Sequence, residues 1–156
     1  MLKWYELEQR FILHEGLRLQ PYRCSRGKLT IGIGRCVETN PLTAEEVKVV
    51  GDWKHGITRG AAVYLLRNDL KRVYQALKKR IDFFGDLDDE RQYALIDMGF
   101  NLGVEGLLRF RKMLKHLKNK HYQEAAEECL NSQYAKCVGK RAERIANILK
   151  TGEFKK

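Results

Sequence analysis

Apolar residues recur at helical spacing over most of this 156-residue chain, and the longest such segment spans residues 57–81. Its apolar positions lie mainly three or four residues apart, as one face of a helix requires: Ala62, Leu65, Leu66, Leu70, Val73 and Leu77. Thr58 is a suitable N-terminal cap. The pattern predicts a single helix that is long enough to join two lobes.

Further helices are predicted on both sides of this segment. Residues 1–14 form a helix that ends at Gly16, and the capping-box spacing of Thr43 and Glu46 begins a short one. Asp86 or Asp88 caps a helix through residue 100, and residues 101–103 end it. The remaining helices are expected at residues 107–118, 122–130 and 140–150, with Gly152 as the last stop.

One region has the pattern of strands instead. Residues 22–24 and 29–33 flank a Gly27-containing turn, which predicts a β-hairpin, and residues 52–56 have the composition of a loop. The fold class is therefore α+β and predominantly helical.

Composition restricts the partners, the location and the cofactors that we expect for the chain. Its formal charge of +10 favours contact with polyanions, but the Lys and Arg residues are spread out and form no basic tail. No apolar run approaches the ~20 residues of a membrane span, and the N-terminal segment lacks the features of a signal peptide. The four cysteines form no metal-binding pattern, so we expect reduced thiols and no metal.

The candidate chemistry lies in residues 14–35, HEGLRLQPYRCSRGKLTIGIGR. Glu15 ends the first helix, where partial burial would keep a carboxyl group protonated and ready to donate. A lone Glu at a helix end is more often a solvated surface charge, so the flanking sequence decides. This segment resembles the catalytic segment of the phage-type lysozymes, in which a Glu is followed nine residues later by an Asp and fifteen residues later by a Thr.

The resemblance implies that Glu15, Cys24 and Thr30 are the catalytic residues, with Cys24 at the position of the Asp. A thiol of ordinary pKa is mostly neutral at pH 7, but Arg23 and Arg26 are near enough in sequence to lower its pKa. Three roles stay open for Cys24: a thiolate that replaces the carboxylate, a nucleophile, or a neutral group that positions water. The alternative is an inert cysteine and a lost activity.

Three later segments extend the resemblance over most of the chain: ITRGAAVYLLRNDL from Ile57, RQYALIDMGFNLG from Arg91 and GKRAERIANILKTGEF from Gly139. On this resemblance the substrate-binding residues are Tyr22, Gly34, Phe100 and Asn101. Supporting roles fall to an Arg35–Asp69 pair, where the family has His and Asp, and to Arg141, which matches an Arg that pairs with the catalytic Glu.

The family also implies an architecture. Residues 1–156 would form one lysozyme-like domain with a cleft between two lobes. The small β-containing lobe is expected at about residues 17–57, the connecting helix at about 58–81, and the helical lobe at about 82–156 together with 1–14.

The function that this implies is that of an endolysin. It would hydrolyse the β-1,4 bond between N-acetylmuramic acid and N-acetylglucosamine in peptidoglycan and cause lysis of the host cell. The resemblance implies no cofactor, and we expect a monomer that binds peptidoglycan, with no nucleic-acid partner and no stable membrane insertion. We expect the protein in the host bacterial cytoplasm until a separate membrane pore protein releases it to the periplasm and cell wall.

Two other functions are compatible with parts of the sequence. A catalytically impaired lysozyme-like protein would bind peptidoglycan without cutting it, because Cys24 has replaced the acid. A basic helical protein that binds nucleic acid would explain the charge of +10, but it leaves the segment from Glu15 to Thr30 unexplained.

Overall fold

A computed structural model describes residues 2–154 of the chain. Met1, the first residue of the expected N-terminal helix, and the last two residues of the expected helical lobe lie outside this range. The chain divides into two compact units, which we call the N-terminal unit (residues 3–71) and the C-terminal unit (residues 72–154 with Leu2). The expected lobe boundaries stay a prediction.

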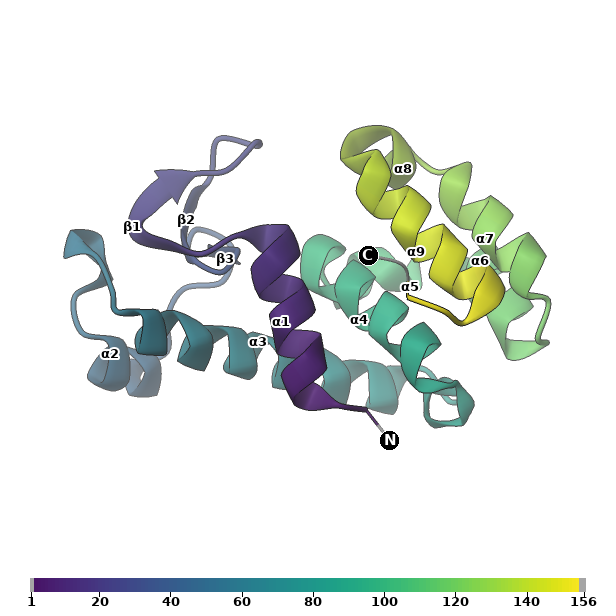
Figure 1. Ribbon diagram of the computed structural model, residues 1–156, viewed down its shortest axis with the longest axis horizontal. Helices are drawn as coiled ribbons and strands as arrows, with labels where there is room; N and C mark the ends of the chain where they lie inside the picture. Colours follow the sequence, from purple (N-terminus) through teal and green to yellow (C-terminus); the bar gives the residue numbers. More distant parts are fainter. Residues whose placement is uncertain (1, 155–156) are drawn as a thin grey trace. The chain divides into compact units, whose positions relative to one another are not determined.

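The N-terminal unit contains a small antiparallel sheet and its helices (Figure 1). Its elements are α1 (Trp4–Glu15), β1 (Arg18–Arg23), β2 (Leu29–Gly32), β3 (Arg35–Cys36), α2 (Ala44–Val50), the short 3-10 helix η1 (Trp53–His55) and the first half of α3 (Arg59–Arg80). The strands follow one another in the order β1-β2-β3. The sheet region and α3 supply the core of this unit. The side chains that show this are almost fully buried: Ile31 and Ile33 from the sheet region, and Leu65 and Leu66 from α3.

The predicted hairpin is present, but the sheet is larger than the sequence indicated. β1 starts four residues earlier than expected and tolerates Pro21 because it is an edge strand. β3 is a third strand of only two residues, too short to show an alternating pattern. Residues 53–55 form η1 where a loop was expected, and Asp52 caps it by accepting the Lys54 N–H.

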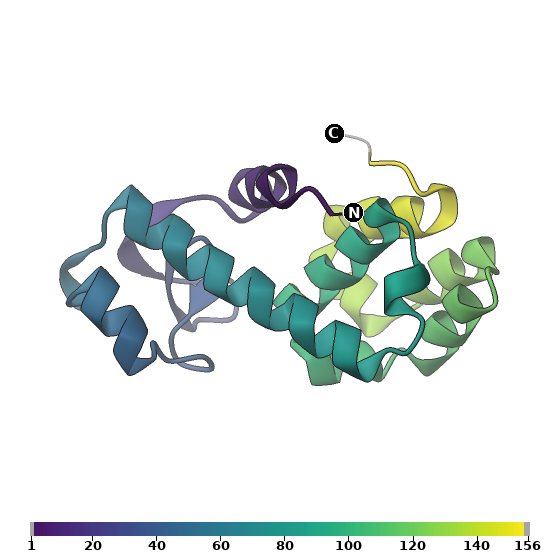
Figure 2. The ribbon, with the colours of Figure 1, turned by 90° about the horizontal axis from the view of Figure 1, so that it is seen from below.

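The expected caps of the N-terminal unit are confirmed. Thr43 and Glu46 make the reciprocal hydrogen bonds of a capping box at the start of α2. The Ala61 N–H donates to Thr58 Oγ1 at 3.0 Å at the start of α3. Helix α3 then runs without interruption for 22 residues (Figure 2), as its apolar period predicted.

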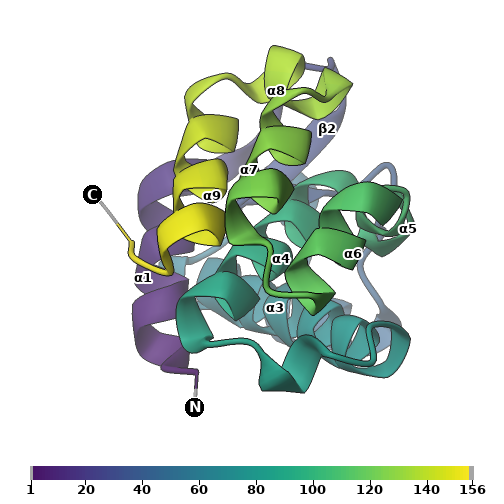
Figure 3. The ribbon, with the colours of Figure 1, turned by 90° about the vertical axis from the view of Figure 1, so that its right-hand side faces the viewer.

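The C-terminal unit is helical. After the second half of α3 and the 3-10 helix η2 (Phe84–Asp86), it contains α4 (Asp89–Leu102), α5 (Val104–Leu108), α6 (Arg111–Lys118), α7 (Tyr122–Leu130), α8 (Gln133–Val138) and α9 (Lys140–Thr151). Helices α7 and α9 pack side by side (Figure 3). Asp88, rather than Asp86, caps α4.

Two features of this unit differ from the expectation. The helix predicted at residues 107–118 is divided into α5 and α6, with Phe110 in a non-helical conformation, and its ring packs edge-on against Tyr134 at 6.1 Å. Tyr134 belongs to α8, a six-residue helix that was not predicted. A period of apolar residues fits a broken and an unbroken helix equally well, so tertiary packing makes the choice.

Over the described residues, no helix combines the length and the apolar character that a membrane crossing demands.

Candidate active site

Glu15 is the last residue of α1, and its side chain is half-buried. The helix ends there because Gly16 adopts a φ of +78°, a conformation that other residues rarely take. The Gly16 N–H still donates to the Ile12 carbonyl at 3.0 Å, which completes the last turn. This stop turns the chain directly into β1, so a carboxyl group stands where the helix meets the sheet.

Cys24 follows β1 at the start of the hairpin turn. Its N–H donates to the Lys28 carbonyl at 2.9 Å, and the Gly27 N–H donates to the Cys24 carbonyl at 2.8 Å, which closes the turn. The backbone N–H groups of Arg26 and Lys28 point at the sulfur and lower the pKa of the Cys24 thiol; burial opposes them only in part, and the Thr30 side chain adds a further hydrogen bond. The turn therefore stabilises a thiolate at this position.

Thr30 lies on β2 and is only 3% exposed. It is paired with Tyr22 on β1 and with Cys36 on β3. Its Oγ1 donates to the Lys28 carbonyl at 3.0 Å, and the same hydroxyl is within hydrogen-bonding reach of the Cys24 sulfur. Thr30 is thus held at the base of the turn, directly beside the thiol.

Tyr22, on β1, is close enough to both Glu15 and Cys24 for their charges to affect its pKa. Burial raises the pKa of its phenol, and the negative charges of Glu15 and Cys24 raise it further, whereas the Arg18 charge lowers it. The Arg18 guanidinium lies over the Tyr22 ring, 4.5 Å from its centroid. These couplings mean that α1, β1 and the turn bring Glu15, Tyr22 and Cys24 to one place.

Arg35, on β3, is the central residue of a buried polar network. Its guanidinium is 2% exposed and forms the expected ion pair with Asp69, with Nη1 3.0 Å from Oδ1. It also binds both carboxylate oxygens of Glu46, at 3.0 and 2.7 Å, and the carbonyls of Asn40 and Pro41. Arg35 thereby ties β3 to α2 and α3.

Glu46 is the main partner that the sequence reasoning missed. Burial would raise the pKa of its carboxyl group, but hydrogen bonds from Arg35, the Thr43 backbone and Asn68 outweigh burial and lower the pKa to about 2. The capping box was the only local signal at this residue, and it accounts for one contact out of several.

Gly34, in the connection between β2 and β3, has a φ of +72°. Gly32, at the end of β2, also has a positive φ, and a side chain there would meet Ala62 of α3 at 3.4 Å. Gly32 therefore serves the contact between the sheet and α3, whereas Gly34 lies in the turn that follows.

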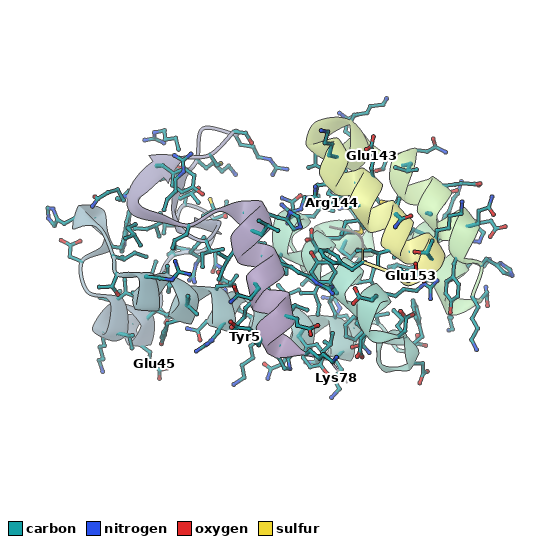
Figure 4. All side chains as sticks on the ribbon, in the orientation of Figure 1. Tyr5, Glu45, Lys78, Glu143, Arg144 and Glu153 are labelled. Atoms are coloured by element: carbon teal, nitrogen blue, oxygen red, sulfur yellow. The ribbon has the colours of Figure 1, made fainter. Side chains whose placement is uncertain are left out.

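The remaining candidates belong to the C-terminal unit. Phe100 and Asn101 are half-buried residues near the end of α4. The Arg141 Nε donates to Asp97 Oδ1 at 2.7 Å, and the Tyr93 hydroxyl donates to Asp97 Oδ2 at 3.2 Å. Figure 4 shows two neighbours of Arg141 on α9, Glu143 and Arg144. The expected pairing of Arg141 with Glu15 stays a prediction.

Among residues 2–154, no three His, Cys, Asp or Glu side chains gather in a way that could hold a metal ion. The side chains in and around the hairpin instead offer a carboxyl group, a thiol, a hydroxyl and a phenol, which suit proton transfer and the holding of a water molecule.

Comparison with known proteins identifies the family. The Phage lysozyme family model matches residues 13–147, which include Glu15, Cys24 and Thr30. The chain is 32% identical over 152 residues to the probable T4-type lysozyme 1 of Dictyostelium discoideum, covering 88% of this chain and 89% of that protein. It is 28% identical over 155 residues to the probable T4-type lysozyme 2 of the same organism, covering 90% and 91%.

A phage protein shows a similar relationship. The endolysin of Acyrthosiphon pisum secondary endosymbiont phage 1 is 30% identical over 128 residues, covering 82% of this chain and 77% of the endolysin. The chain therefore belongs to the Phage lysozyme family and is a glycoside hydrolase, a lysozyme that acts on peptidoglycan.

Proposed function

We propose that this lysozyme hydrolyses the β-1,4 bond between N-acetylmuramic acid and N-acetylglucosamine, with Glu15 as the general acid. The observation that supports this assignment is the electrostatic coupling of Tyr22 to both Glu15 and Cys24. Cleavage of a glycosidic bond requires the acid and the group that handles the attack to share one site, and this coupling supports such a site for Glu15 and Cys24.

In the proposed reaction Glu15 gives its proton to the oxygen of the leaving sugar as the bond to the anomeric carbon breaks. Cys24 and Thr30 hold a water molecule whose oxygen forms the new bond to that carbon from the opposite face. The water proton passes to the Cys24 thiolate, which the turn N–H groups stabilise. Attack from the opposite face inverts the configuration of the sugar.

Other residues would bind the glycan or hold the site in shape. Tyr22 and Gly34 in the N-terminal unit, and Phe100 and Asn101 in the C-terminal unit, are the proposed substrate-binding residues. The Arg35–Asp69 ion pair would hold the site in shape, because it fixes β3. Thr30 lies on β2, which is paired with β3, so its position depends on β3 as well. Arg141 is the proposed partner of Glu15.

We further propose an endolysin that acts as a monomer and causes lysis of a bacterial host. In this proposal the protein accumulates in the host cytoplasm and reaches the periplasm and cell wall through a membrane pore made by another protein. No cofactor takes part in the proposed reaction.

The decisive experiment measures reducing ends released from purified peptidoglycan by the wild type and by Glu15→Gln. The amide cannot donate the proton, so we expect a loss of about a hundredfold to ten-thousandfold. Glu45→Gln is the matched control, since Glu45 is exposed on α2 (Figure 4). A folded Glu15→Gln variant with more than about a tenth of wild-type activity would refute the assignment.

The same assay tests the rival function. A peptidoglycan-binding protein without catalysis would sediment with cell walls and release no reducing ends. The substitution of Cys24 for the family's Asp is the feature that favours this rival. The lowered pKa of the thiol argues against it, because an ionised sulfur still supplies a negative charge.

A further inference from the structure

Helix α6 of the C-terminal unit (Figure 3) has one apolar side and one positively charged side. Met113 and Leu117 are buried, so the apolar side packs into the unit and the opposite side is exposed. We use the name α6 cationic face for the exposed cations of this helix and of the turn that follows it: Arg111, Lys112, Lys115, Lys118 and Lys120.

Most of these charges are not neutralised by the protein. Lys118 pairs with Asp82, with Nζ 3.2 Å from Oδ2. Within residues 2–154, none of the other four cations of the face forms an ion pair. Arg111 and Lys115 are four residues apart, and like charges at this spacing destabilise a helix. The face therefore carries repulsion that a negatively charged partner would relieve.

Three of these cations also stand where local structure disfavours them. Arg111 and Lys112 lie in the first turn of α6, near the positive end of the helix dipole, and this turn has neither an acidic residue nor a side-chain cap. Lys120 has a φ of +61°, in the region that favours glycine. A sequence that breaks local preferences in one segment is expected where a function gains from it. The common result of the three choices is positive charge.

The chemistry of the face favours one kind of polyanion. Single-stranded nucleic acid is held by aromatic rings on which bases stack, but the ring of Phe110, beside the face, packs against Tyr134. No large apolar side chain is exposed between residues 109 and 121, so the face lacks the groups that penetrate an apolar layer. Unpaired lysines and arginines on one convex side suit a surface of phosphate groups, as the headgroups of anionic lipids present.

We propose that the α6 cationic face binds the surface of a bilayer that contains anionic phospholipids and holds the protein there without insertion. The contacts join the N–H groups of the lysines and the arginine to the lipid phosphates. The setting rests on the proposed function, in which the protein passes the inner membrane on its way to the cell wall. The binding itself involves no catalysis, so it is measured separately from activity.

The test measures co-sedimentation of the protein with vesicles. The probes are vesicles of equal parts phosphatidylglycerol and phosphatidylcholine, and vesicles of phosphatidylcholine alone. We expect the wild type to bind only the first, and to be released as salt is added. In R111Q/K112Q/K115Q the apparent Kd for the anionic vesicles should rise about a hundredfold, because each cation near such a surface contributes about fivefold. Glutamine suits a helix as well as lysine does, so cleavage of soluble glycan strands should be unchanged.

The matched control is K48Q/K54Q/R59Q, which removes the same charge from exposed positions on α2, η1 and α3. It should bind the anionic vesicles nearly as tightly as the wild type. An equal loss of binding in both triple variants would overturn the proposal, because it would show attraction by net charge alone. Equal binding of the wild type to both kinds of vesicle would also overturn it.

Two further measurements separate the proposal from its neighbours. If the wild type binds duplex DNA in a gel shift more tightly than it binds the anionic vesicles, and R111Q/K112Q/K115Q loses that binding, the face belongs to nucleic acid and the proposal is wrong. Failure of the proposed function shows differently: the wild type would release no reducing ends from peptidoglycan and would still bind the anionic vesicles through α6.

Discussion

The Thr30 hydroxyl lies within hydrogen-bonding reach of the Cys24 sulfur, and this proximity helps to lower the pKa of the Cys24 thiol. The same hydroxyl donates to the Lys28 carbonyl at 3.0 Å. It has a single proton, which can turn toward the sulfur when Cys24 ionises. The substitution of a thiol for the family's carboxylate is thus accompanied by a turn that stabilises the charged form.

The first prediction concerns the ionisation of Cys24. The rate of its alkylation should rise with pH with a midpoint below that of an ordinary thiol, because hydrogen bonds from Arg26, Lys28 and Thr30 favour the thiolate. Thr30→Val should move the midpoint up, whereas Thr30→Ser, which keeps the hydroxyl, should not. Mass spectrometry of the labelled peptides gives each rate. Cys129 serves as internal control, since burial raises the pKa of its thiol to about 12 and it should stay unlabelled.

The second prediction concerns the role of Cys24 in lysis. Cys24→Ala should lose about a hundredfold or more of the activity, because no group would hold and deprotonate the water. Cys24→Asp should keep the activity, since it restores the carboxylate of the family pattern. Release of reducing ends measures both, with Cys137→Ala as the control at an exposed thiol. Wild-type activity in Cys24→Ala would show that Cys24 only packs against its neighbours.

The third prediction concerns stability in acid. The carboxyl group of Glu46 has a pKa lowered from 4.5 to about 2. The stabilisation from its ionised form is complete above pH 4.5 and is lost as pH falls toward 2. It amounts to roughly 3 kcal/mol. Urea unfolding at a series of pH values should show this loss, and Asn68→Ala, which removes one hydrogen bond to Glu46, should make it smaller. An identical acid dependence in both proteins would contradict the assignment.

The fourth prediction concerns Arg91, which joins the start of α4 to the end of α9. Its guanidinium donates to the Leu149 and Lys150 carbonyls at 2.8 and 3.1 Å, pairs with Asp88 and lies over the Tyr122 ring. Arg91→Met should lower the free energy of unfolding by about 3 kcal/mol, because two helix-end carbonyls lose their donors. Arg111→Met, at an exposed position of α6, should change it by less than about 0.5 kcal/mol.

The fifth prediction concerns salt. A chain with a net charge of +10 that acts on an anionic wall should lose activity steeply as salt is added, because the reach of its field falls to about 8 Å near physiological ionic strength. Turbidity of wall suspensions and cleavage of a neutral soluble substrate are measured in parallel. Salt should affect the first far more than the second. Equal salt dependence in the two assays would exclude an electrostatic role in wall binding.

Local sequence was sufficient wherever one residue and its near neighbours determine the structure. Gly16 ends α1 because it can adopt a positive φ, Thr43 and Glu46 cap α2, and Gly152 closes α9 in a left-handed conformation. The apolar period of α3 was long enough to be unambiguous. The spacing of Glu15, Cys24 and Thr30 likewise resembles that of the phage-type lysozymes, the family whose model matches the chain.

Tertiary structure decided what depends on contacts between distant residues. The two residues of β3 are a strand only because β2 lies beside them, and the break at Phe110 goes with its packing against Tyr134. The sequence pattern predicts only a capping role for Glu46, whereas in the folded chain Glu46 also forms an ion pair with Arg35. The same holds for the thiol: its pKa is lowered by N–H groups that only the folded turn directs at the sulfur. Sequence determines which groups are present, whereas their ionisation and partners depend on distances that only the folded chain sets.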